Sequence, residues 1–339
     1  MIKLKDILKE FGIDLALPDG TIKGGPSKKK KKKKKKGVNE CIITHSILDK
    51  KVIMAKNRDR AYTAKVKVVR ELVGQIEMVY ILDDDTDWSE GMNSKGIGII
   101  NSALMVDADE KEKKKIKKGG RPSEDGLKIR RALMYPKLYQ TIKSIIKFTG
   151  KDNAEVGVKG HTFVASKAKS FAIEMTSEQG PAIKELDRRL GHVRTNHGYE
   201  YGNAGYTSGQ SKNSSHTRWD IAQKVLQKAK KPTDVLDGLS GYYPVNMKNN
   251  PYRNIDMVKN KSKKDVLSTT GQLMMNLTDL EFLVRMDSDK SEWLGIEDRT
   301  PDYYEPKIKI KVEYVKNTKV KWYLYIKRNY YEIKRYVKW

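Results

Sequence analysis

The chain has 339 residues, 38% of them hydrophobic, and its 69 Lys and Arg side chains against 43 Asp and Glu give a formal charge of +26. A chain of this length and composition can bury a full core, which excludes a wholly disordered protein. The length predicts one large domain with appendages.

The chain has one cysteine, Cys41, which excludes an intramolecular disulfide framework and any metal site built from several cysteines. The first residues are charged and lack the apolar stretch of a secretory signal. No apolar run approaches the ~20 residues of a membrane span. We therefore expect a protein without a membrane segment in a reducing compartment, either cytoplasmic or associated with a virus particle.

Positive charge is concentrated near both ends of the chain, with +8 in residues 1–40 and +9 in residues 307–339. Nine consecutive lysines, Lys28–Lys36, lie between glycines, and their mutual repulsion predicts a solvated linker. Two roles stay open for this run: a tether to nucleic acid or another polyanion, and a plain spacer. The basic C-terminal tail is a second candidate for polyanion binding.

In chain order, the first predicted element is a hairpin in which strands at 41–47 and 52–55 flank a turn at 49–51. Apolar residues also predict strands at 65–80, 97–104, 161–165, 171–175 and 190–195.

A charged stretch at 107–122 predicts a mobile surface loop. Helical spacing then predicts two short helices, or one kinked at Pro136, up to Ile146, and another helix at 217–230. The basic segment 307–339 alternates apolar and polar residues and predicts a C-terminal hairpin added to a sheet. Strands, then helices, then strands indicate a layered α+β architecture.

Four motifs follow one another along the chain. Cys41 begins the first strand, and the turn would place the segment 56–59 (KNRD) alongside it. The other three motifs are 90–101 (EGMNSKGIGIIN), 193–197 (VRTNH) and 214–218 (SSHTR). This ordered set resembles the cysteine N-terminal nucleophile (Ntn) hydrolases, the superfamily of choloylglycine hydrolase, penicillin V acylase, acid ceramidase-like amidases and the penicillin acyltransferases. The resemblance covers most of the chain from 41 to about 310.

The resemblance implies a four-layer αββα sandwich over residues 41–339, preceded by a leader over 1–40. It implies one residue for each catalytic role: Cys41 as nucleophile, Asp59 to hold the α-ammonium and thiol, Asn101 and Asn196 in the oxyanion hole, and Arg218 as a cation that favours the thiolate. Auxiliary or substrate contacts fall to Lys56, Asn57, Arg58 and His197. The bile salt members have an arginine at the position of Lys56. Arg58 or Arg60 could take the role of that arginine here.

In such an enzyme the thiol attacks an amide carbonyl and the α-amine of the same residue is the general base, so we expect no metal and no cofactor. The α-amine of Cys41 is free only after the Glu40–Cys41 bond is cut. Longer precursors of the family make this cut themselves by an N-to-S acyl shift. We therefore expect a self-processed amidase or acyltransferase that acts on the C–N bond of a small linear amide.

Other interpretations stay open. Each site residue alone has an ordinary structural explanation, and a Cys–His dyad with a residue such as His45 is conceivable, although no histidine pair has metal-ligand spacing. The second function considered is a basic protein that binds nucleic acid or packs inside a virus particle on a degenerate version of this fold. Its leader would be removed by an external protease, since 8–10 (LKE) and 38–40 (VNE) resemble the cleavage sites of tailed-phage prohead proteases.

Overall fold

The computed structural model describes residues 40–60, 63–104, 124–147, 157–176, 179–205, 209–241, 243, 245, 249–253, 267–287, 291–315, 321–327 and 330–335. For residues 209–211, 315, 321–327 and 330–335 the description covers the backbone alone. Chain contacts divide the protein into Met1–Lys36 and Gly37–Trp339, and every described residue belongs to the second unit.

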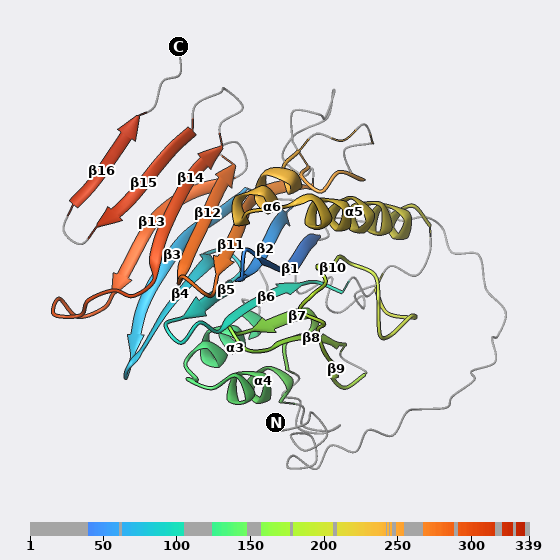
Figure 1. Ribbon diagram of the computed structural model, residues 1–339, viewed down its shortest axis with the longest axis horizontal. Helices are drawn as coiled ribbons and strands as arrows, with labels where there is room; N and C mark the ends of the chain where they lie inside the picture. Colours follow the sequence, from blue (N-terminus) through green and yellow to red (C-terminus); the bar gives the residue numbers. More distant parts are fainter. Residues whose placement is uncertain are drawn as a thin grey trace. The chain divides into compact units, whose positions relative to one another are not determined.

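Two eight-stranded sheets and four helices make up the described part of the chain (Figure 1). Sheet A has, in spatial order, β10 (His192–Arg194), β1 (Cys41–Leu48), β2 (Lys51–Arg60), β11 (Ser268–Asn276), β12 (Glu281–Asp287), β14 (Lys309–Val315), β15 (Lys321–Lys327) and β16 (Tyr330–Arg335). Sheet B has β13 (Ser291–Arg299), β3 (Ala64–Val73), β4 (Ile76–Asp83), β5 (Trp88–Asn93), β6 (Gly98–Ser102), β7 (Gly160–Ala165), β8 (Ser170–Met175) and β9 (Ala182–Glu185). The helices are α3 (Glu124–Leu133), α4 (Leu138–Ile146), α5 (Gly209–Lys228) and α6 (Pro232–Leu239).

The hairpin of β1 and β2 follows the sequence prediction. Asp49 and Lys50 both adopt left-handed conformations, with φ of 50° and 60°. A two-residue hairpin turn of type I′ requires such values at both positions. The resulting antiparallel register sets Cys41 opposite Arg58. Because β10 pairs with the other edge of β1, Cys41 begins an interior strand of the sheet.

The main hydrophobic core is shared by the two sheets. One continuous cluster joins residues such as Ile43 on β1 and Phe282 on β12 to Val66 on β3 and Ile100 on β6, all fully or almost fully buried. Since side chains alternate along each strand, every second residue of β1 and β2 points into this core. Burial of apolar surface at ~25 cal/mol per Å² makes this cluster the main stabilising feature of the fold.

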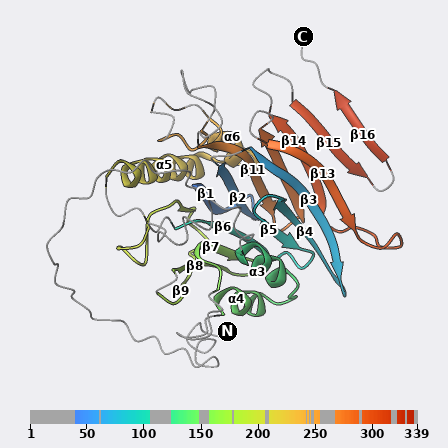
Figure 2. The ribbon, with the colours of Figure 1, turned by 180° about the vertical axis from the view of Figure 1, so that it is seen from behind.

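Helices pack on the remaining face of each sheet. A second apolar cluster joins Ala222 of α5 and Leu236 of α6 to Ile42 and Met274 of sheet A (Figure 1). Helix α3 lies against β5, where the Asn93 side chain donates to the Leu133 carbonyl at 2.8 Å (Figure 2). The helices therefore contact both apolar and polar side chains of the strands that they cover.

Helix α3 meets the strand turn closely enough to require a glycine. A Cβ added to Gly126 would lie 1.8 Å from the Asp87 carbonyl oxygen, a distance that no side chain can occupy. On the same face, Arg130 Nη1 donates to Ser89 Oγ at 2.7 Å. Packing thus selects the small residue at a helical position where glycine is otherwise unfavourable.

The α+β class expected from the sequence is confirmed, with two corrections to its elements. The single strand predicted at 65–80 is wrong: it is the hairpin of β3 and β4, which turns at Gly74 with a φ of 59°. The helix predicted from 217 begins at Gly209, so Arg218 lies in the middle of α5 and not on its first turn. The predicted C-terminal strands do join the sheet, because β14 runs parallel to β12 and pairs with β15.

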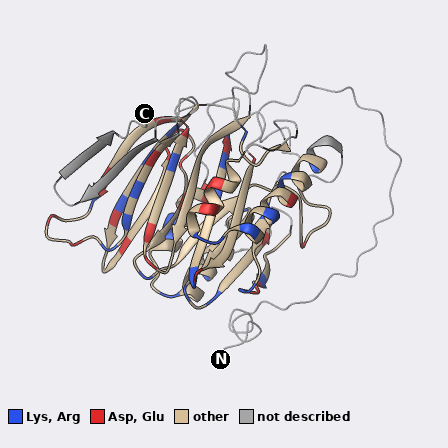
Figure 3. Cartoon of the chain, turned by 45° about the horizontal axis from the view of Figure 1, so that its top comes forward, with Lys and Arg blue, Asp and Glu red and all other residues tan. Residues whose placement is uncertain are grey.

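Lys and Arg residues occur on α5 and on strands of the described part of the chain and are not confined to one element (Figure 3). Residues 1–39, which make up nearly all of the predicted leader and include Lys28–Lys36, and the charged stretch at 107–122 lie outside the described residues. The predictions made for them stay predictions. None of the described helices combines the length and apolar character needed to cross a membrane.

Candidate active site

Cys41 is buried, with 3% of its surface exposed, and it shares the core-facing side of β1 with Ile43. The neighbouring strand supplies a cation to its sulfur, because Arg60 Nη1 lies 3.5 Å from Sγ. The same guanidinium donates to the Asp59 carbonyl at 2.9 Å, which fixes its position. Of the two residues expected to replace the family's arginine, Arg60 is the one in contact with the thiol.

Both carbonyls around Cys41 accept hydrogen bonds. The Asp59 backbone N–H donates to the Glu40 carbonyl oxygen at 3.0 Å, continuing the ladder between β1 and β2 past Cys41. On the other side, Ser102 Oγ donates to the Cys41 carbonyl oxygen at 3.3 Å. The Glu40–Cys41 peptide is therefore held in a fixed position beside the thiol.

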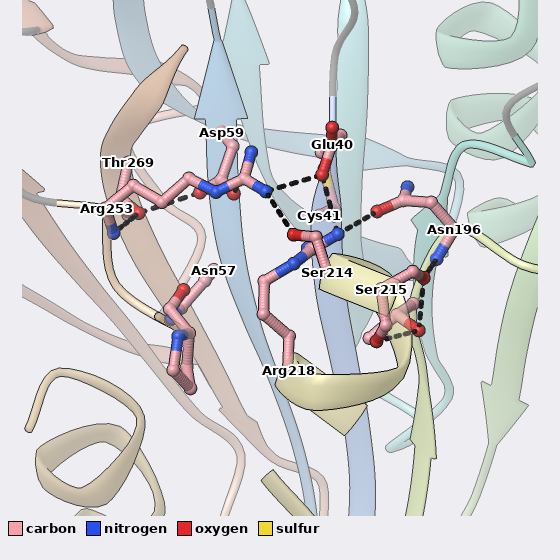
Figure 4. Close-up of polar contacts among 12 residues, drawn as sticks. Glu40, Cys41, Asn57, Asp59, Asn196, Ser214, Ser215, Arg218, Arg253 and Thr269 are labelled. Carbon is pink, nitrogen blue, oxygen red and sulfur yellow. Dashed lines mark hydrogen bonds and ion pairs between the residues drawn. The ribbon is translucent and has the colours of Figure 1, made fainter. Parts of the chain in front are cut away.

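The Glu40 side chain binds two arginines from distant parts of the chain (Figure 4). Its Oε2 accepts one hydrogen bond from Arg218 Nη2 and one from Arg253 Nη2, each at 2.6 Å. Arg218 is fully buried and Arg253 is 2% exposed. Charge-assisted bonds of this length, shielded from water, are strong and geometrically specific.

Asp59 lies next to this carboxylate on the side of β2 opposite Arg60. Its Oδ1 accepts a hydrogen bond from Thr269 Oγ1 at 2.7 Å, and its Oδ2 lies 3.6 Å from Arg253 Nη1. Burial raises the pKa of the Asp59 carboxyl above its ordinary value, although Arg253 and Arg218 oppose the shift. Arg253 is thus shared by two carboxyl groups.

Asn196 follows β10 and connects the arginines to β6. Its Oδ1 accepts a hydrogen bond from Arg218 Nη2 at 3.1 Å, and its Nδ2 donates to the Ala103 carbonyl at 2.7 Å and approaches Ser102 Oγ at 3.5 Å. The Asn196 backbone N–H donates to Ser215 Oγ at 2.9 Å, which anchors the asparagine to α5. The amide is therefore oriented at both ends (Figure 4).

Asn101 takes a different position from the one expected for an oxyanion-hole side chain. Both N–H groups of its amide are committed, to the Lys159 carbonyl at 3.0 Å and to Thr162 Oγ1 at 2.8 Å. Strand alternation turns the next residue, Ser102, toward Cys41 instead. On the strand that the motif indicated, the side chain that reaches Cys41 is therefore that of Ser102, one residue after Asn101.

Lys56 and Arg58 face the core side of β2 and pair with acids of sheet B. Lys56 Nζ binds Glu90 and the Asn101 carbonyl, while Arg58 lies 3.8 Å from Asp83 and 3.9 Å from Glu90. Burial raises the pKa of the Glu90 carboxyl, but Lys56 and Arg58 outweigh it and hold the pKa below its ordinary range. These two cations on β2 connect sheet A to β4 and β5 of sheet B.

Asn57 and His197, expected as auxiliary residues, have well-defined structural partners. Asn57 lies on the α6 side of β2, where its amide donates to the Pro251 carbonyl at 2.8 Å and to the Leu239 carbonyl at 3.2 Å. His197 Nδ1 lies 2.9 Å from Ser215 Oγ, and the ring stacks on His216. Burial lowers the pKa of His197 to about 3, so the ring is neutral at physiological pH. In the part of the chain that the structure describes, no group of three or more His, Cys, Asp or Glu residues could hold a metal ion.

Besides Ser102, two further members of this site, Arg253 and the Glu40 side chain, were not predicted from the sequence. Arg253 follows 249–252 (NNPY), a segment whose pattern carries no signal for a buried cation. Glu40 was expected only as the residue before the cut, not as a carboxylate bound by two arginines. The one general rule that applies to Arg253 is that a buried charge needs a partner, and its use requires knowing that the residue is buried.

No protein-family model matches the sequence, and no curated protein sequence matches it. Among solved structures, the fold is similar to that of penicillin V acylase from Agrobacterium tumefaciens, with a TM-score of 0.41 and 10% sequence identity. That similarity covers 72% of this chain and 84% of the acylase chain.

Proposed function

We propose that this chain is a cysteine amidase or acyltransferase of the Ntn type, acting on the C–N bond of a linear amide through a thioester on Cys41. Cleavage of the Glu40–Cys41 bond makes it active. The observation that carries the proposal is the arrangement around this bond: a thiol beside Arg60 and, next to it, the Glu40 carbonyl held by the Asp59 N–H at 3.0 Å. In this proposal, the two sheets with helices on their outer faces correspond to the αββα order of that superfamily.

Cleavage proceeds by an N-to-S acyl shift. The Cys41 thiol loses its proton, Sγ bonds to the Glu40 carbonyl carbon, and the bond from that carbon to the Cys41 nitrogen breaks as the nitrogen is protonated. The Asp59 N–H stabilises the negative charge that develops on the Glu40 oxygen. Water then adds to the thioester carbon and returns a proton to sulfur. The products are a leader that ends in Glu40 and a Cys41 with free thiol and α-amine.

The mature site uses the same sulfur for substrates. The new α-amine accepts the thiol proton, and the thiolate adds to the substrate carbonyl carbon. We assign the oxyanion to the Ser102 hydroxyl and to Asn196 Nδ2, in place of the Asn101 amide. One N–H of Asn196 is bound to the Ala103 carbonyl at 2.7 Å, but the other makes only the 3.5 Å approach to Ser102 Oγ. The leaving amine takes the proton from the α-ammonium, and the thioester is resolved by water or by an acceptor amine. Asp59 and Arg218 hold the amine and Asn196 in place.

Intact mass of purified wild type and Cys41→Ala tests the proposal. We expect the wild type to lose residues 1–40 and the variant to keep them. Cleavage of the isolated full chain should be first order, with a rate independent of protein concentration, because the reaction is intramolecular. An active protein that retains Met1 would contradict the mechanism, and cleavage of Cys41→Ala at the same bond would assign the cut to an external protease.

A panel of amides then tests the mature reaction. Quenching the reaction during turnover should trap an acyl group on Cys41, detected as a mass increase on the peptide that begins with this residue. Cys41→Ser keeps a nucleophile of the same shape but lower reactivity, and we expect slow cleavage and weak turnover from it. A mature chain with no turnover and no acyl adduct would refute the enzymatic function.

A further inference from the structure

The two arginines that bind Glu40 form a site whose occupant leaves with the leader. Arg218 comes from the middle of α5 and Arg253 from the segment before β11, and both Nη2 atoms converge on one carboxylate oxygen at 2.6 Å. Ser214 Oγ lies 3.4 Å from Arg253 Nη2. After cleavage at Glu40–Cys41, both guanidiniums lose this acceptor while the elements that carry them remain.

Glu40 has a defined relation to the reacting sulfur. During self-cleavage its carbonyl carbon becomes the acyl carbon of a thioester on Cys41, so the precursor passes through an acyl-enzyme in which Glu40 is the acyl group. The carboxylate at Arg218 and Arg253 is then four bonds from the acyl carbon. An external substrate that forms a thioester on the same sulfur places its acyl chain in the same surroundings.

We propose that the Arg218–Arg253 pair is the acyl-group subsite of the mature enzyme and that it selects amides whose acyl group carries a carboxylate four bonds from the scissile carbonyl. A glutaryl amide meets this description, because glutarate is the Glu side chain and carbonyl without the α-amino group, and an α-glutamyl amide meets it as well. This inference rests on the proposed thioester function. It goes beyond that function by naming the substrate class.

The geometry favours an anion over a neutral polar group. Two buried cations beside a single carboxyl oxygen gain most from a full negative charge, and replacing it by an amide leaves them with a weaker acceptor. Asp59, 3.6 Å from Arg253, balances only part of the charge and has a raised pKa. The fixed distance also selects length, since a succinyl chain is one methylene shorter.

The first experiment measures binding without catalysis, on the full chain with Cys41→Ala so that no cut occurs. In this background Glu40→Ala removes the side chain beyond Cβ, which is the size of acetate. We expect sodium acetate, compared with sodium chloride at equal ionic strength, to raise the melting temperature of Cys41→Ala/Glu40→Ala by several degrees. It should have no such effect on Cys41→Ala, whose site is filled, or on the triple variant that adds Arg253→Gln.

The second experiment measures specificity on the self-processed chain and needs no change at Glu40. We expect kcat/KM for glutaryl p-nitroanilide to exceed that for the matching carboxamide and for the succinyl compound by roughly 10- to 100-fold, the range for one charge-assisted hydrogen bond. Arg253→Gln should abolish this preference, so that the glutaryl compound and its carboxamide are turned over with the same kcat/KM.

The outcomes separate the two proposals. Acetate stabilisation that depends on Arg253 supports the subsite even if no amide is turned over, a result that would refute only the enzymatic function. Turnover with equal rates for the glutaryl compound and its carboxamide would overturn the substrate class and leave the enzyme proposal intact. Absence of the acetate effect in a folded Glu40→Ala variant would overturn the subsite itself.

Discussion

Glu40 and Arg253 are 213 residues apart in the sequence, yet Arg253 Nη2 donates to Glu40 Oε2 at 2.6 Å. The contact joins the residue before the interior strand β1 to the segment before β11, and Arg218 of α5 completes it. Two buried cations therefore hold the Glu40 side chain, directly before Cys41. In the proposed enzyme, the two arginines that bind the residue before the scissile bond also form the acyl-group subsite.

Loss of the Glu40 charge should destabilise the precursor. In a Cys41→Ala background, we expect Glu40→Gln to lower the free energy of unfolding by about 3 kcal/mol, because it leaves two buried guanidiniums without their full counter-charge. Urea unfolding measures the difference. Glu124→Gln is the matched control: its side chain is 78% exposed on α3, so a change within about 0.5 kcal/mol is expected. Equal stability of Glu40→Gln and its parent would mean that the ion pairs contribute little.

The Arg60 guanidinium should control the reactivity of the thiol. Since Nη1 lies 3.5 Å from Sγ, it stabilises negative charge on sulfur. We expect Arg60→Leu to slow both self-cleavage and alkylation of Cys41 by iodoacetamide about tenfold, which corresponds to ~1.4 kcal/mol. Arg60→Lys keeps the charge and should retain most of the rate. If Arg60→Leu folds and reacts at the wild-type rate, the cation has no part in activating the thiol.

The strands around Cys41 could be predicted because local signals determine them. A turn at Asp49 and Lys50 between two apolar stretches fixes the register of β1 and β2, and this register alone brings residues 57–59 to the cysteine. The helix that carries Arg218 was also found, although it begins eight residues earlier than expected, since its first turns lack an apolar face that marks a helix in the sequence.

The faces of the strands and the distant partners could not be predicted. A motif located β6, but the choice between Asn101 and Ser102 depends on which side of the strand meets sheet A, and a shift of one residue reverses it. The Arg253 backbone is held at the site by hydrogen bonds to Thr269 of β11, a contact for which neither spacing nor propensity gives a rule. The role of the Glu40 carboxylate depends on Arg218 and Arg253, which come from distant parts of the chain.

The choice between neighbouring residues of β6 gives a direct test of the oxyanion assignment. We expect Ser102→Ala to lower kcat of the mature chain by about 10- to 100-fold with little change in melting temperature, and Asn196→Ala to lower it by ~10²- to 10³-fold. Asn101→Ala should instead lower the free energy of unfolding by about 1 to 3 kcal/mol, because it leaves the Lys159 carbonyl and Thr162 without a donor. A large loss of kcat in a stable Asn101→Ala, with Ser102→Ala unaffected, would restore the original assignment.

His45 should make the fold sensitive to acid. It lies on the core side of β1 between Phe163 and His192, and neither ring nitrogen has a hydrogen-bond partner in the described part of the chain. Burial, together with His192 and Arg188, lowers the pKa of His45 from 6.5 to about 3. Between these values the unfolded chain binds a proton that the folded chain does not, so the free energy of unfolding falls as the pH is lowered below about 6.5, by at most ~1.4 kcal/mol per pH unit.

His45→Phe removes this proton site and keeps an aromatic ring beside Phe163. Urea unfolding of both proteins in the Cys41→Ala background at pH 7.5 and pH 4.5 gives the comparison, and only the change between the two pH values matters, since the larger ring alters packing at both. We expect the parent to lose about 2 to 3 kcal/mol more than His45→Phe on going to pH 4.5, because that pH is two units below the ordinary histidine pKa. The buried His161 and His197 have pKa values also lowered to about 3, and they leave a residual acid dependence in both proteins. An identical loss in the two proteins would mean that His45 takes up its proton in the folded state.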